Sequence, residues 1–114
     1  MKSVDLVTSY QTGAGELSLS IVVGNAQIGA SVVRLNKKVL AQGEISDLEL
    51  GGARGLAGKA LNIKSVVTDV NDATNKTSIT YVLTRGAQVQ EFTSKAEANG
   101  NGESLVYRAL FKFL

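Results

Sequence analysis

Residues 104–114 read Ser-Leu-Val-Tyr-Arg-Ala-Leu-Phe-Lys-Phe-Leu, and this stretch decides the fold class. Its odd-numbered positions are all apolar, whereas Ser, Arg and Lys alternate with apolar residues at the even-numbered positions. A period of two is that of a β-strand with one buried face, because successive side chains point to opposite sides. We therefore predict a strand whose core-facing residues are Leu105, Tyr107, Ala109, Phe111 and Phe113.

The same period recurs upstream. Residues 17–23, 61–67 and 79–83 each place apolar side chains on alternate positions. Gly- and Asn-rich turns such as residues 99–102 separate these runs at intervals of roughly ten residues. The pattern indicates about eight strands without helices between them, which favours antiparallel pairing over a parallel sheet. We predict that residues 1–114 form a single antiparallel β-sandwich, or a small barrel.

Two segments depart from simple alternation. Val32 and Val33 are adjacent, which predicts a β-bulge or a strand that is apolar on both faces. Residues 51–58 contain four glycines and disfavour both regular helix and strand, so we expect a loop with at most one short helical turn. The same region resembles a phosphate-binding loop only faintly, because Ala60 stands where that motif needs a hydroxyl.

The apolar positions of the strands define a predicted core. Five of the six aromatic residues lie after residue 80, which indicates that the later strands form the thick part of one core. The residues that we expect to be buried are Leu19, Ile21, Ile63, Val67, Tyr81, Leu83, Tyr107 and Phe111.

Composition excludes several kinds of chemistry. The chain has no His, Cys, Trp or Pro. Disulfides, zinc-thiolate sites, cysteine nucleophiles and the Ser-His-Asp arrangement are therefore impossible. An enzyme that uses carboxylates and lysine alone remains an alternative, but Glu44, Asp47 and Glu49 have the spacing of a solvated strand face. We expect a non-enzymatic protein without a cofactor.

Charge and hydropathy indicate which kinds of partner the protein is expected to lack. The net charge is +2, which is not the basic footprint of a nucleic-acid binder, although residues 34–64 are mildly basic. No apolar window is long enough to span a membrane, so we expect neither nucleic acid nor a bilayer as partner. The first residues contain no apolar run of signal-peptide length, which favours a cytoplasmic protein over a mature exported form.

Two polar loops could bind a ligand. Residues 69–75 offer two Asp and two Asn side chains, and hard oxygen ligands suit calcium. The glycine and glutamate of a helix-loop-helix calcium hand are missing, and Asn and Asp also favour ordinary turns. We therefore predict a turn and assign no metal ligands. The alternative function is a ligand-binding module that uses residues 69–75 and 99–102, with calcium as a possible requirement.

The outward face of the last strand is unusually apolar. Val106 and Leu110 lie among its even-numbered positions, and either a neighbouring loop or a second subunit must cover them. The absence of proline also leaves strand edges free to pair with another chain. We predict a function in protein–protein interaction or self-assembly, with a protein partner or a homo-oligomer. The candidate interface residues are Val106, Arg108, Leu110 and Lys112.

Overall fold

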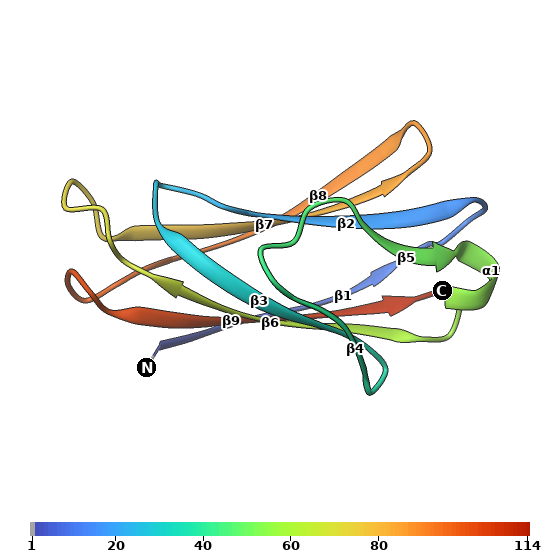
Figure 1. Ribbon diagram of the computed structural model, residues 1–114, viewed down its shortest axis with the longest axis horizontal. Coiled ribbons are helices and arrows are strands. Elements are labelled where there is room, and N and C mark those ends of the chain that lie inside the picture. The colour runs from blue at the N-terminus through green and yellow to red at the C-terminus, as the bar shows by residue number, and fades with distance from the viewer. Residues whose placement is uncertain (1) are drawn as a thin grey trace.

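Over residues 2–114, which the computed structural model describes, nine strands form two sheets that pack face to face (Figure 1). The sheets do not close into a barrel, so the sandwich is the correct one of the two predicted architectures. Strands hold 66% of the residues and helix 4%. The strands are β1 (Lys2–Tyr10), β2 (Glu16–Val23), β3 (Ile28–Leu35), β4 (Lys38–Gly43), β5 (Leu48–Gly52), β6 (Ala60–Thr68), β7 (Lys76–Arg85), β8 (Gln88–Glu97) and β9 (Ser104–Phe113).

The first sheet has the order β1-β9-β6-β3-β4, and the second has the order β5-β2-β7-β8. Neighbouring strands are antiparallel with one exception, since β1 pairs in parallel with β9 from Lys2↔Leu105 to Tyr10↔Phe113. This pairing departs from the purely antiparallel sandwich that we predicted. The next strand along the chain, β2, lies in the opposite sheet, so β1 cannot form a hairpin with it and joins a distant strand instead.

The inward-facing side chains fill the space between the sheets. All the predicted core residues are at most 2% exposed except Ile21, which is half-buried. Ile21 borders an open hollow of about 380 Å³ between β2 and residues 43–46, and this opening explains its exposure. Phe111 lies at the centre of the core, with edge-to-face contacts to Tyr81 and Phe92 at ring-centre distances of 5.7 and 5.1 Å.

The two irregular segments have the predicted character only in part, because Gly51 and Gly52, which were predicted to lie in a loop, extend β5. The glycine-rich stretch contains one helical turn, α1 (Ala53–Leu56), whose two apolar side chains are each 2% exposed. Beside the adjacent valines, the register between β3 and β4 shifts after Val33, as expected for a bulge. Val33 is fully buried, whereas Val32 faces outward and is half-buried. No helix in this description of residues 2–114 has the length and apolar character needed to cross a bilayer.

Candidate interaction surface

The four predicted interface residues lie on the outer face of the five-stranded sheet. They all belong to β9, which runs between β1 and β6. Arg108 and Lys112 are exposed, Leu110 is half-buried, and Val106 is only 8% exposed. The alternation along β9 therefore places these side chains on one outward face, although they are not equally accessible to a partner.

Side chains of the same sheet cover Val106. Its register partners are Ser3 on β1 and Val66 on β6. The Arg108 guanidinium donates a hydrogen bond to the Ser3 hydroxyl at 2.7 Å, so the long side chain of Arg108 reaches across toward β1 beside Val106. No second subunit is needed to explain why Val106 is buried, because it is already 8% exposed in the single chain.

The accessible apolar surface lies instead on the neighbouring strands. Val7 on β1, Ile28 on β3 and Val66 on β6 are 62%, 61% and 38% exposed. Sequence analysis did not select these residues, although a signal was present. Val7 follows the inward-facing Leu6, and Val66 precedes the buried Val67, so each strand carries an apolar residue on its outer parity.

Basic side chains gather in the middle of this outer face. Lys64 on β6 is the direct register partner of Arg108, and Arg34 on β3 is one row further along. One carboxylate, Asp5 on β1, is the register partner of Arg108 on the other side. An open hollow of about 550 Å³ lies over them and is also lined by Val7. We call this surface the basic face; its members are Val7, Ile28, Arg34, Lys64, Val66, Arg108, Leu110 and Lys112.

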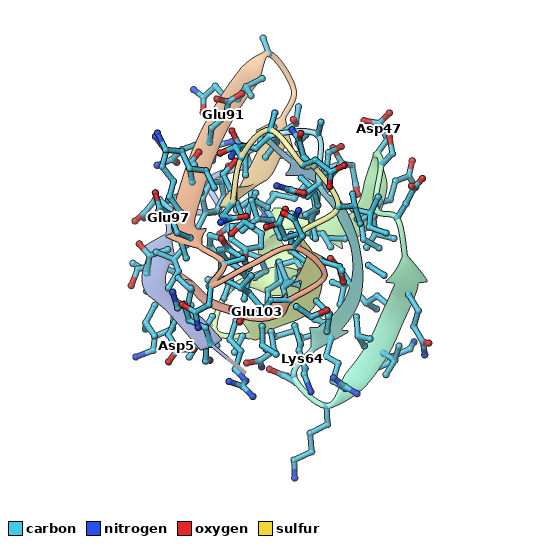
Figure 2. All side chains as sticks on the ribbon, turned by 90° about the vertical axis from the view of Figure 1, so that its left-hand side faces the viewer. Asp5, Asp47, Lys64, Glu91, Glu97 and Glu103 are labelled. Atoms are coloured by element: carbon cyan, nitrogen blue, oxygen red, sulfur yellow. The ribbon has the colours of Figure 1, made fainter. Side chains whose placement is uncertain are left out.

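The outer face of the four-stranded sheet has the opposite character. Short hydroxyl side chains cover its middle, and the Thr80 and Thr93 hydroxyls are hydrogen-bonded at 2.9 Å. Exposed carboxylates surround them, while Lys76 and Lys95 lie toward one end. In Figure 2, Asp47 and Glu91 lie on the side of the sandwich opposite Lys64. We call this surface the acidic face; its members are Glu16, Ser18, Ser20, Val22, Asp47, Glu49, Thr80, Val82, Thr84, Val89, Glu91 and Thr93.

Two members of the acidic run that raised the enzyme alternative, Asp47 and Glu49, belong to the same surface. Glu44, Asp47 and Glu49 are all exposed. Glu49 faces outward opposite Ser18, and the Asp47 backbone amide donates to the Ser20 hydroxyl at 2.9 Å. Of the three, only Glu49 lies on a strand face as expected, because Glu44 and Asp47 belong to the loop between β4 and β5.

The two polar loops lie together at one end of the sandwich. The Gly102 amide donates to the Asp69 carbonyl at 2.8 Å, and the Asn101 amide group donates to the Asp72 carboxylate at 3.2 Å. Asn71 forms a turn of the predicted kind, in which its side-chain oxygen accepts from the Ala73 amide at 3.0 Å. The alternative function, a ligand-binding module, requires these two loops to lie close together, and they do.

Gln27 organises the first of these loops. Its side-chain oxygen accepts from the Val70 and Asn71 amides at 2.7 and 2.9 Å. Its side-chain nitrogen donates to the Thr74 and Lys76 carbonyls at 3.2 and 3.1 Å. Sequence analysis missed Gln27, because a glutamine in a turn gives no sign that it will be buried against a loop far along the chain.

Asp69 is the most unusual residue of the end loops. It is 1% exposed, since it continues the inward parity of the buried positions of β6. Neither of its carboxylate oxygens accepts a hydrogen bond from the part of the chain that the structure describes. In that part of the chain, no three acidic, His or Cys side chains gather closely enough to hold a metal ion.

Two tyrosine hydroxyls are sealed in the core. The Tyr107 hydroxyl is 2.6 Å from the Thr77 hydroxyl, whereas the Tyr81 hydroxyl has no hydrogen-bond partner within residues 2–114. Burial, and secondarily the neighbouring Tyr107, raises the pKa of Tyr81 well above its ordinary value. The Tyr81 side chain is fully enclosed by the core.

Comparisons with models of protein families, with curated protein sequences and with solved structures give no match to this chain.

Proposed function

We propose that the protein is a non-enzymatic interaction module that binds protein through its basic face. The observation that carries the proposal is the exposure of Val7, at 62%, in the hollow that it lines together with Arg34, Lys64 and Arg108. Ile28, which is 61% exposed, lies on the same face but toward one end of β3. Exposed apolar side chains next to arginines are typical of the central part of a protein interface, where few residues provide most of the binding energy.

The arrangement of charge supports the same proposal. Lys64 and Arg108 lie directly opposite each other on neighbouring antiparallel strands, and like charges in that position destabilise a sheet. A partner that brings carboxylates to this row would relieve the repulsion. Asp5 is the only carboxylate among the residues that line the hollow.

Photo-crosslinking tests the proposal. A benzophenone amino acid replaces Val7 on the basic face or, as a control, Val70 in the end loop, which is 47% exposed. We expect a covalent adduct from position 7, either in the purified protein or in an extract of the cells that produce it. An excess of unlabelled wild-type protein should abolish this adduct, whereas a Lys64→Glu, Arg108→Glu competitor should not.

Two results would contradict the proposal. One is the absence of any adduct from position 7 in both preparations. The other is an adduct that the Lys64→Glu, Arg108→Glu protein competes away as well as the wild type does, because the basic face would then play no part in binding.

Asp69 favours a second candidate function, a cation-dependent ligand site in the end loops. A buried carboxylate without hydrogen bonds is unfavourable by several kcal/mol in its ionised form, and a bound cation would offset that cost. Thermal denaturation with added Ca²⁺ should then raise the melting temperature of the wild type but not that of Asp69→Asn. Equal melting shifts in both proteins, or none in either, would rule out this candidate.

A further inference from the structure

We propose that the basic face binds the acidic face of a second copy of this chain, so that the sandwiches stack head to tail. The inference rests on the proposed function, because it identifies the partner of the same surface. It is carried by the complementarity of the two outer faces in charge, apolar surface and position.

Charge is the first complementary property. The middle of the basic face presents Arg34, Lys64 and Arg108, all exposed. The acidic face presents Asp47, Glu49 and Glu91, also exposed and placed along its two edges, with Asp47 and Glu49 at β5 and Glu91 on β8. Opposite potentials on two surfaces guide their association and fix their relative orientation. Because the net charge is only +2, this separation is not visible in the composition.

Exposed apolar surface is the second property in which the two faces are complementary. Val22 and Val89 on the acidic face are 54% and 60% exposed, comparable to Val7 and Ile28 on the basic face. Apart from Val82, the remaining middle positions of the acidic face carry serine and threonine. These short side chains leave the sheet surface flat enough for a second sheet to approach to about 10 Å, the usual spacing between packed sheets.

The position of the charged residues on the two faces is the third complementary property. Glu91 precedes Phe92 on β8, and Leu110 precedes Phe111 on β9, while the Phe92 and Phe111 rings are in contact across the core. Glu91 and the basic residues of β9 therefore lie above and below the same part of the sandwich. A copy displaced mainly along the direction in which the sheets stack would bring the acidic edges of its outer face over the basic face of the first.

The two outer faces are also large enough to form a protein–protein interface of standard size. The molecule measures 44 × 28 × 21 Å, and Figure 1, viewed down the shortest axis, shows the two sheets one above the other. Each outer face therefore extends over roughly 44 by 21 Å. That is comparable to the ~800 Å² that each partner contributes to a standard interface.

Charge also determines the symmetry. Two basic faces placed against each other would bring Lys64 and Arg108 of one copy close to the same residues of the other. Joining unlike faces leaves one free basic face and one free acidic face at the ends of every assembly, so further copies can add. The predicted product is an open row of sandwiches rather than a closed dimer.

Charge reversal on each face tests this arrangement by light scattering and sedimentation across protein concentration. The basic-face variant is Lys64→Glu with Arg108→Glu, and the acidic-face variant is Glu49→Lys with Glu91→Lys. We expect the wild-type mass to rise above the 11.9 kDa monomer with concentration and to fall as salt increases from about 0.05 M to about 0.5 M. Each variant alone should associate about a hundredfold more weakly.

Mixing the two variants gives the sharpest readout. The mixture should associate again, because the unaltered basic face of one variant meets the unaltered acidic face of the other. A control with the same change in net charge, Lys37→Glu with Lys59→Glu, should assemble like the wild type. Circular dichroism verifies that each variant is folded. A variant that is not is replaced by its neutral counterpart, Lys64→Gln with Arg108→Gln for the basic face or Glu49→Gln with Glu91→Gln for the acidic face.

The outcomes separate this inference from the proposed function. If the basic-face variant loses association while the acidic-face variant does not, the inference fails and the proposed function stands. The same conclusion follows if the purified wild type stays monomeric while position 7 forms a competed adduct with another polypeptide. If the wild type is monomeric and position 7 forms no adduct, both fail.

Discussion

Replacement of Phe111 by alanine should remove a large part of the stability of the sandwich. Phe111 is fully buried and its ring contacts those of Tyr81 and Phe92, so its truncation leaves a cavity between the two sheets. Core Phe→Ala substitutions cost about 3–5 kcal/mol, and each lost aromatic pair adds about 0.5–1.5 kcal/mol beyond the buried area. We expect a loss near the upper end, about 4–5 kcal/mol.

Urea denaturation followed by far-ultraviolet circular dichroism measures this loss, because a chain without tryptophan gives no tryptophan fluorescence signal. The measurement belongs at low protein concentration and high salt, where self-association does not contribute to stability. Val89→Ala is the matched control. Its side chain is 60% exposed, and we expect a change within about 0.5 kcal/mol. A loss below about 1 kcal/mol for Phe111→Ala would refute the assignment of this ring to the centre of the core.

Three further predictions concern buried polar groups. Tyr81→Phe removes a hydroxyl without a hydrogen-bond partner and should leave the free energy of unfolding unchanged or higher. Tyr107→Phe breaks the hydrogen bond with Thr77 and should lower the free energy of unfolding by about 1–3 kcal/mol. Equal effects of the two substitutions would contradict this difference in hydrogen bonding. Above pH 10, Tyr81 keeps its proton in the folded state while the unfolded chain loses it. The free energy of unfolding should therefore fall by about 1.4 kcal/mol for each pH unit above 10. Tyr81→Phe should remove this slope when denaturation is measured at several pH values. Gln27→Leu should speed hydrogen exchange at the two loop amides that its side chain holds, and unchanged exchange there would show that the loop orders itself.

Local alternation was enough to assign the inward residues. In β9 the direction of each side chain follows from its parity, so the burial of Tyr107, Phe111 and their neighbours was predictable from adjacent residues alone. The break at Val32 and Val33 likewise gave a local sign of the bulge. The placement of these residues needed no knowledge of which strands are neighbours.

The composition of the outer faces could not be predicted in the same way. Lys64 and Arg108 become neighbours only because β6 pairs with β9 in one particular register. The parallel partner of β1 and the loop contacts of Gln27 depend on equally distant pairings. A single sequence contains no signal for such register, so the basic face and its acidic counterpart became visible only once the two sheets were assembled.

The position of β9 also sets the order in which the molecule can fold during synthesis. β9 lies between β1 and β6, yet every other strand leaves the ribosome before it. Until then β1 lacks β9, the sheet partner that it has among the described residues 2–114, and pairs such as Ser3 and Arg108 must close a separation of 105 residues. Contacts so distant in sequence slow folding. The five-stranded sheet is thus completed only after β9 emerges, and the unpaired edges of β1 and β6 are exposed to chaperones and to other nascent chains until that moment.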